Sequence, residues 1–175
     1  MTWISAKLDS LGIAYMVTGG SAVSFWGQVR TTADIDIVVR ISPSRISVLM
    51  AALKDEAYID EEDVKEAVSE KRMFNVIYNI TAFKVDFAVM DEANLYAKEG
   101  FSRRKKLEIA GRPLWVISPE DLVLSKLRWM QSAGGSERQL QDCRSIMDLN
   151  KGRLDLAYMQ KWAPQIGVEK EYGSL

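Results

Sequence analysis

Aspartates are the residues of this chain whose spacing points most directly to chemistry. Asp34 and Asp36 stand two apart in a run of β-branched residues, and Asp86 lies alone between core-type residues in a similar run. Alternate side chains of a strand point to the same face, so Asp34 and Asp36 share a polar face. Two neighbouring carboxylates repel each other, and a cation between them makes the arrangement stable.

A metal site follows if the strand that carries Asp86 lies beside the strand that carries Asp34 and Asp36. Three converging carboxylates suit a two-metal site, with the metals roughly 3.5–4 Å apart. Carboxylate and phosphate oxygens favour Mg²⁺, or Mn²⁺ in its place, together with a nucleoside triphosphate. Taken singly, the acids also fit an exposed polar strand face, and the metal interpretation depends on their occurring together.

A glycine-rich turn precedes the acids. Gly19, Gly20 and Ser21 end an apolar strand and open a helix, a geometry that suits phosphate binding by backbone N–H groups. Arg30 and Thr32 lie just before the acidic strand, where they would meet phosphate or order the loop. A glycine pair alone is equally typical of an ordinary turn.

Composition restricts the chemistry further. The 175 residues include no histidine, which excludes His-based triads, HExxH zinc sites and histidine general bases. The single Cys143 cannot form an internal disulfide, so a cytoplasmic location is expected. A net charge of −1 argues against a whole-surface nucleic-acid binder, and no apolar run resembles a signal peptide or a membrane span.

The elements that must position the acids alternate between strands and helices in the first part of the chain. Apolar periodicity predicts early helices and strands, and alternation predicts a hairpin that carries Asp86. A second hairpin is expected around Gly111, and Ser42-Pro43 looks like a helix N-cap followed by proline. The predicted segments are helices 3–11, 22–27 and 43–53, a surface helix within 55–72, and strands 15–18, 34–40, 74–80, 83–89, 105–110 and 114–117.

Helices dominate the C-terminal part. Ser118 followed by Glu120 and Asp121 is close to a capping box. We expect helices over 120–131, 137–149 and 154–163, and the tail from Gly167 onward has a composition that allows disorder. This order predicts an α+β fold, with a catalytic core over 1–118 and a C-terminal helical region over 119–175 packed on it.

The combined pattern resembles the DNA polymerase beta-like nucleotidyltransferase superfamily. The resemblance rests on Gly19-Gly20-Ser21, a gap of twelve residues, Asp34-Ile35-Asp36-Ile37 and the later Asp86. The stretch from Arg30 to Asp36 is similar to the abortive-infection-type and minimal nucleotidyltransferases, which include toxin–antitoxin proteins. This resemblance implies a mixed sheet flanked by helices. It also implies that all three aspartates hold the metal and act in catalysis, and that the glycine turn contacts the triphosphate.

The C-terminal half carries a less specific match. Lys126 interrupts an apolar helical stripe, which fits either a snorkelling lysine or one that reaches a charged partner. The resemblance implies that Lys126 contacts the triphosphate. Arg138 and Asp142 match a family motif in part, with Gln141 where lysine is common, and their spacing also fits a surface ion pair.

Two further features have ordinary and functional interpretations. The basic run Arg103–Lys106 fits a solvated loop or strand edge better than an RNA contact. Trp26 follows the glycine turn, where it would stack a base, although core packing is favoured.

These observations favour a metal-dependent nucleotidyltransferase that moves a nucleoside monophosphate from a triphosphate to an acceptor hydroxyl. The resemblance allows an RNA 3′ end such as tRNA, a protein or a small molecule as acceptor, and the short chain favours a macromolecule. A toxin–antitoxin partner or a homo-oligomer fits the same resemblance. The alternatives are a non-catalytic nucleotide-binding partner protein and, more weakly, a metal-dependent phosphodiesterase.

Overall fold

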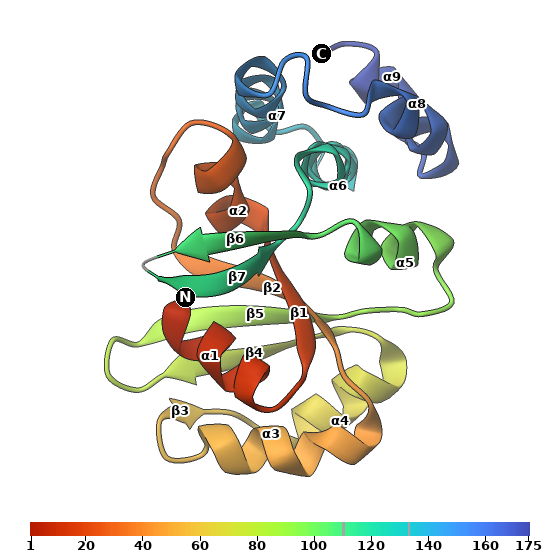
Figure 1. Ribbon diagram of the computed structural model, residues 1–175. Coiled ribbons are helices and arrows are strands. Elements are labelled where there is room, and N and C mark those ends of the chain that lie inside the picture. The colour runs from red at the N-terminus through yellow and green to blue at the C-terminus, as the bar shows by residue number, and fades with distance from the viewer. Residues whose placement is uncertain (110, 133) are drawn as a thin grey trace.

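A single mixed β-sheet forms the centre of the computed structural model, which describes residues 1–109, 111–132 and 134–175 (Figure 1). Within these residues the sheet has seven strands in the order β3-β4-β5-β2-β1-β7-β6. The strands are β1 (Ala14–Thr18), β2 (Asp34–Arg40), β3 (Ala57–Tyr58), β4 (Met73–Tyr78), β5 (Phe83–Val89), β6 (Lys105–Ile109) and β7 (Arg112–Val116). The sheet with its flanking helices confirms the predicted α+β class.

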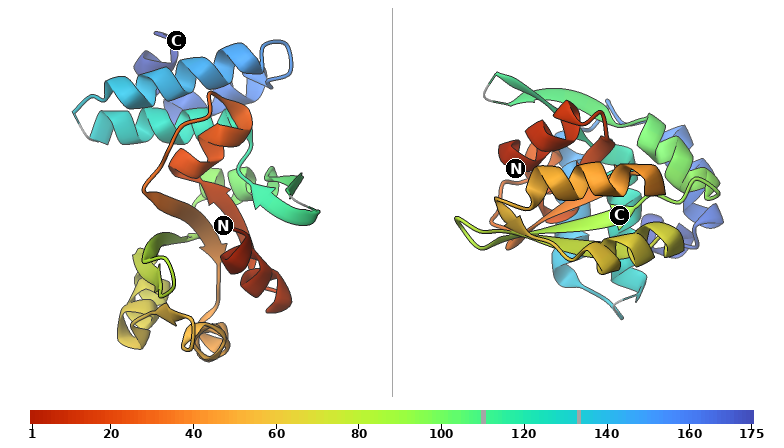
Figure 2. Two further views of the ribbon diagram at one scale, coloured as in Figure 1. Left: turned by 90° about the vertical axis from the view of Figure 1, so that its left-hand side faces the viewer. Right: turned by 90° about the horizontal axis from the view of Figure 1, so that it is seen from below.

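Helices flank the sheet toward both ends of the molecule in the side view (Figure 2), and the helix over Gly19–Trp26 lies beside the C-terminal helices, away from the helices over Ile46–Leu53 and Glu61–Glu70. The N-terminal helices are α1 (Thr2–Ser10), α2 (Gly19–Trp26), α3 (Ile46–Leu53) and α4 (Glu61–Glu70). The later helices are α5 (Leu95–Ser102), α6 (Pro119–Ser132), α7 (Glu137–Leu149), α8 (Leu156–Gln165) and α9 (Glu169–Tyr172). None of the described helices is long and apolar enough to cross a membrane.

The pairing of β2 with β5 decides where the acids lie. These two central strands run parallel, with Asp36 opposite Asp86 and Asp34 opposite Lys84. Strand alternation sends the intervening side chains, among them Ile35, into the buried core. The polar face of the two strands therefore presents three carboxylates and one ammonium group side by side near the middle of the sheet.

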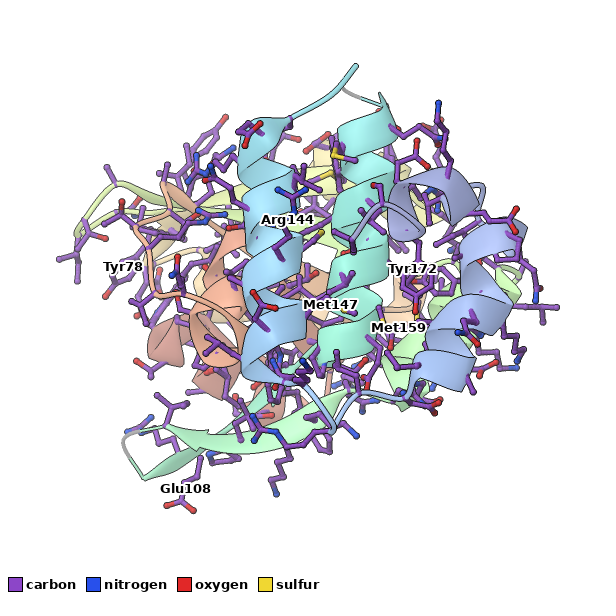
Figure 3. The ribbon with its side chains drawn as sticks, turned by 90° about the horizontal axis from the view of Figure 1, so that it is seen from above. Tyr78, Glu108, Arg144, Met147, Met159 and Tyr172 are labelled. Atoms are coloured by element: carbon purple, nitrogen blue, oxygen red, sulfur yellow. The ribbon has the colours of Figure 1, made fainter. Side chains whose placement is uncertain are left out.

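Helix α6 joins the sheet to the C-terminal helices. It packs against α7, α8 and α9, and Figure 3 shows it lying between α7 and the α8–α9 pair. The Trp26 indole N–H donates to the Ile117 carbonyl at 2.8 Å, and the Asn150 amide donates to the Trp26 carbonyl at 2.7 Å. Trp26 therefore packs between the core and these helices, as its ordinary interpretation expects.

Several sequence predictions hold and a few are wrong. The hairpin β4–β5 forms as expected, and Ser118 caps α6 by accepting from the Asp121 N–H at 3.1 Å. Ser42 makes no side-chain cap bond, and the chain enters α3 through a short 3₁₀ turn, Pro43–Arg45. The tail is ordered, because Val168 is fully buried. Ala110, the predicted end of a strand, lies outside the described residues.

Candidate active site

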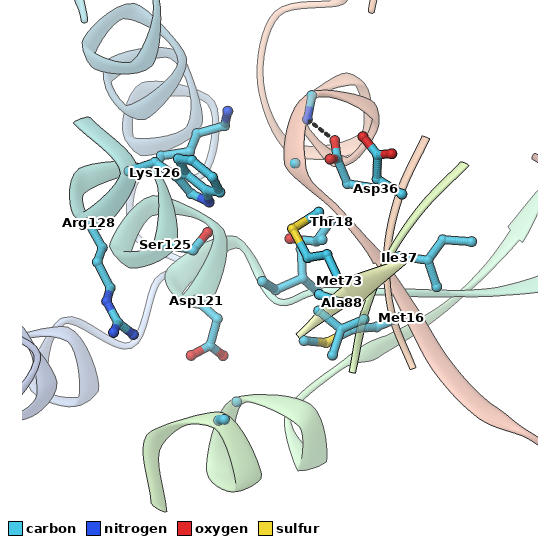
Figure 4. Close-up of a pocket in the computed structure, with 18 of the residues that line it drawn as sticks. Met16, Thr18, Asp36, Ile37, Met73, Ala88, Asp121, Ser125, Lys126 and Arg128 are labelled. Carbon is cyan, nitrogen blue, oxygen red and sulfur yellow. Dashed lines mark hydrogen bonds between the residues drawn. The ribbon is translucent and has the colours of Figure 1, made fainter. Parts of the chain in front are cut away.

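A cleft of about 590 Å³ opens between one face of the sheet, α5 and α6 (Figure 4). Its lining includes most of the residues that the sequence predicted, together with several that it did not. The predicted residues that line the cleft are Gly19, Gly20, Arg30, Thr32, Asp34, Asp36, Asp86 and Lys126. Ser21 is the predicted residue outside this lining.

The strand that carries Asp86 lies beside the strand that carries Asp34 and Asp36, as expected, and Asp86 is the most deeply buried of the three aspartates. The pKa of Asp36 is raised above its usual range, chiefly because burial penalises the charged carboxylate. The negative charges of Asp86 and Asp34 raise it further, whereas the Gly20 N–H and the positive charge of Lys126 oppose the rise. The Asp36 carboxylate is thus less stable in its charged form here than in water.

Lys84 is the nearest positive charge to these acids and was not predicted as a site residue. Its ammonium lies 2.9 Å from Asp86 Oδ2 and 3.5 Å from Asp34 Oδ2. The hydrogen bond to Asp86 is the main reason that the pKa of Lys84 is raised, so the side chain is a cation at neutral pH. The signal in the sequence was its spacing of two residues from Asp86, which places both on one strand face.

The chemistry of the acids fits a divalent cation. Asp86 Oδ1 is buried and has no hydrogen-bond partner within the described residues, which leaves a hard oxygen available as a ligand. The structure itself shows no ready-made group of three or more metal-ligating side chains among the residues it describes. Asp34 and Asp86 instead contact Lys84, so metal binding requires these side chains to rearrange.

The glycine turn lies directly against Asp36. Gly19 has a φ of +58°, and a β-carbon placed there would stand 2.0 Å from Asp36 Oδ2. The Gly20 N–H donates to the same oxygen at 3.3 Å. Only glycine fits at position 19, because any side chain would displace the carboxylate.

Two hydroxyls fix the loop that leads into β2. Ser21 is buried and donates to the Asp34 carbonyl at 3.3 Å, and Thr32 donates to the same carbonyl at 3.3 Å. Ser21 therefore links α2 to β2 by a hydrogen bond. Thr32 orders the loop, which is one of the two roles that its position in the sequence suggested.

A buried ion network links the loop to the C-terminal helices. Arg30 donates to both oxygens of Asp142, at 2.9 and 2.7 Å, and the Lys126 ammonium lies 2.8 Å from Asp142 Oδ2. Lys126 also donates to Gln139 at 2.9 Å. Lys126 thus reaches a charged partner and does not snorkel. Asp142 is buried, so its interpretation as a surface partner of Arg138 is wrong.

Asp142 holds its negative charge firmly. Burial alone would raise the pKa of this carboxyl, but hydrogen bonds from Arg30 and Lys126 outweigh burial and lower it. The pair Arg30–Asp142 spans 112 residues of sequence. No local pattern in a single sequence predicts such a contact.

The basic run is largely used inside the protein. Arg103 lies over the Tyr158 ring and contacts Glu120, and Arg104 lies over the rings of Phe101 and Trp115. Lys106 also lies over the Trp115 ring, so three of the four charges of the run pack against neighbouring side chains, which supports its ordinary interpretation.

A profile of the family "nucleotidyltransferase of unknown function (DUF6036)" matches residues 3–163. The match spans the sheet, the cleft and α6 to α8. The chain belongs to this nucleotidyltransferase family. The broader resemblance to nucleotidyltransferases is thereby confirmed, whereas the abortive-infection or minimal subtype stays a prediction. A comparison with curated proteins found no significant match.

Solved structures show the same fold. An antigenic nucleotidyltransferase-like protein from Paracoccidioides brasiliensis aligns over 94% of this chain and 87% of its own, with 20% identity and a TM-score of 0.61. The antibiotic-resistance factor ANT(2'')-Ia aligns over 98% and 92%, with 15% identity and a TM-score of 0.62. The lincosamide antibiotic adenylyltransferase LnuA, solved with lincomycin, aligns over 85% and 94%, with 13% identity and a TM-score of 0.56.

Proposed function

We propose that this DUF6036 nucleotidyltransferase transfers a nucleoside monophosphate from a nucleoside triphosphate to an acceptor hydroxyl. The observation that carries the proposal is the parallel register of β2 and β5, which sets Asp36 beside Asp86 next to the glycine turn. Asp34, Asp36 and Asp86 would hold Mg²⁺ or Mn²⁺, which when bound would offset the charge of the phosphates and the departing pyrophosphate.

The cleft offers the triphosphate both backbone and side-chain partners. The N-terminus of α2 begins at Gly19, where the absence of a side chain lets phosphate approach the backbone. Arg30, whose guanidinium lies beside Gly20, and Lys126 on α6 bring positive charge to the cleft, although both also contact Asp142. Trp129 also lines the cleft with 62% of its surface exposed, and its indole offers a face on which a base can stack.

Asp86 is the side chain best placed to accept the proton of the acceptor hydroxyl. Its free Oδ1 provides the acceptor lone pair, and its burial excludes competing water. Beyond Asp86 the floor of the cleft is apolar and includes Met16, Met73 and Ala88. That surface suits the body of an acceptor whose hydroxyl points toward Asp86.

A small-molecule acceptor is the first to test. ANT(2'')-Ia has been solved in complex with adenylyl-2''-tobramycin, and LnuA has been solved with lincomycin bound. The alignment with ANT(2'')-Ia covers 92% of its chain. Because this chain matches nearly the whole of both proteins, its short length no longer favours a macromolecular acceptor. RNA and protein acceptors remain as further arms of the test.

The decisive experiment is a transfer assay with each α-labelled nucleoside triphosphate, Mg²⁺ or Mn²⁺, and three acceptor pools: small metabolites and antibiotics, total RNA, and cell protein. The control is Asp34→Asn/Asp36→Asn. Label that moves to one pool and disappears in the control establishes the enzyme and its acceptor class. Absence of transfer to every pool, with no nucleotide binding by calorimetry, contradicts the proposal.

The second candidate is a nucleotide-binding partner protein without turnover, such as one member of a toxin–antitoxin pair. It is favoured by one observation: Asp142 already pairs with both Lys126 and Arg30, which reduces the positive charge that these two side chains offer to phosphate. Nucleotide binding in calorimetry without transfer, together with a stable complex on pull-down, would support this function over the first.

A further inference from the structure

Four side chains form a square on the polar face of β2 and β5. Asp34 stands opposite Lys84, and Asp36 stands opposite Asp86, so three corners are acidic and one is basic. The arrangement follows from the parallel register and strand alternation alone. A lysine is thus built into the cluster that the resemblance assigns to metal ions.

Lys84 stabilises this cluster through two of its acids. Its ammonium contacts Asp86 at 2.9 Å and Asp34 at 3.5 Å, and it offsets part of the repulsion among the three carboxylates. Its side chain is 40% exposed, whereas that of Asp86 is 12% exposed. The lysine can therefore move its charged end into water without disturbing the core, which the aspartate cannot do.

We propose that Lys84 is a displaceable counter-ion that occupies the acidic cluster until a divalent cation takes its place. The proposal rests on the function proposed above, because it concerns the same cluster. The lysine and the metal compete for Asp34 and Asp86, so Lys84 weakens metal binding when no nucleotide is present. A triphosphate brings new negative charge to the cleft and gives the released ammonium another partner. Lys84 thus couples metal binding to nucleotide binding.

Manganese titration of the intact protein without nucleotide tests this competition by electron paramagnetic resonance. Lys84→Met removes the competing charge, and we expect it to bind Mn²⁺ roughly threefold to tenfold more tightly than the wild type. Lys84→Arg keeps the charge and should stay within about twofold of the wild type. Lys54→Met removes one exposed lysine at the end of α3 and is the matched control.

Thermal unfolding provides a readout that does not depend on activity. In the presence of a chelator, Lys84→Met should have a lower melting temperature than the wild type because the carboxylates lose their counter-ion. Added Mn²⁺ should raise its melting temperature by more than that of the wild type, since a ligand that binds the folded state more tightly stabilises it more.

The outcomes separate the two proposals. Equal Mn²⁺ affinity of the wild type and Lys84→Met overturns the role of Lys84 and leaves the metal site intact. A failure of both proteins to bind Mn²⁺, even with a non-hydrolysable triphosphate, overturns the proposed metal-dependent function as well. Tighter binding by Lys84→Met alone supports the counter-ion.

Discussion

Gly19 and Asp36 constrain each other at the level of single residues. The backbone at Gly19 is left-handed, and its missing β-carbon leaves the space that an Asp36 oxygen fills. The chain offers a natural comparison in Gly12, which has a similar φ of +64° but meets no atom within 4 Å among the described residues. A substitution at Gly12 therefore measures the cost of backbone strain alone, and one at Gly19 measures backbone strain together with the collision with Asp36.

Gly12→Ala should lower the free energy of unfolding by about 1–2 kcal/mol, the cost of left-handed backbone for a residue with a β-carbon. Gly19→Ala should cost about 1–3 kcal/mol more, because Asp36 must move as well. Urea denaturation of both variants checks the difference. Equal losses of stability would show that Asp36 gives way freely, contrary to the packing described here.

The acids and the glycine turn were predictable from sequence because their signal is local. Asp34 and Asp36 share one strand face by alternation, and the turn precedes them at a short fixed spacing. Lys84 was missed although its spacing to Asp86 carries the same kind of signal. The partners of Asp142 were not predictable, because Arg30 and Lys126 reach it only through the tertiary fold.

Among the elements, the loop before β2 depends on α6 and α7 for its position. Asp142 on α7 holds Arg30 of the loop and Lys126 of α6, and both acidic and basic partners are largely shielded from water. Lys126 is 3% exposed and Asp142 is 5% exposed. Removing one member leaves a buried charge without a partner, which is far more costly than losing a surface ion pair.

Asp142→Asn should therefore lower the free energy of unfolding by about 3 kcal/mol at neutral pH. The folded pKa of Asp142 is lowered, so its contribution is present above the unfolded value and is lost as pH falls through the folded one. The difference in the free energy of unfolding between the wild type and Asp142→Asn should thus become smaller below about pH 4. Urea denaturation across pH measures it.

Asp148→Asn on the same helix is the matched control, because Asp148 is exposed. Its cost should stay within about 0.5 kcal/mol at every pH, as for ordinary surface substitutions. A similar small cost for Asp142→Asn would mean that Arg30 and Lys126 find other partners.

Most elements with a visible period were predicted, but β3 and α5 were not. The hairpin β4–β5 shows clear alternation, and α6 has its Ser118 cap. Strand β3 has two residues, too few to show a period. Helix α5 was missed although Asn94 caps it by accepting from the Ala97 N–H at 3.0 Å, a signal that the sequence does contain.

For the whole molecule, the reactivity of the Cys143 thiol measures how often the C-terminal helices separate from the core. The thiol is fully buried, and burial raises its pKa to about 12. It lies between α7 and α6, with its sulfur 3.7 Å from the Val123 carbonyl. Both the low thiolate fraction and the missing access to solvent should suppress its reaction with thiol reagents.

We expect native protein at about pH 8 to react with a thiol reagent only through opening, so labelling in urea should follow the same midpoint as tryptophan fluorescence. Mg²⁺ with a triphosphate should slow labelling, because the cleft is lined by both the sheet and α6 and a ligand bound there would link them. Rapid labelling in native buffer would instead indicate that α6 and α7 separate while the sheet stays folded.

The strand order has a consequence for the chain during its synthesis. The acids, the glycine turn and Lys84 all lie on segments that precede residue 90, whereas Lys126 and Asp142 follow it. Strand β1 can pair with β7, at Val17 and Val116, only after β7 has been synthesised. As the polypeptide leaves the ribosome, the three aspartates and Lys84 therefore emerge well before Lys126 and Asp142. During that interval Lys84 has already been synthesised and can contact Asp34 and Asp86, whereas Asp142, the partner of Arg30, has not yet been translated.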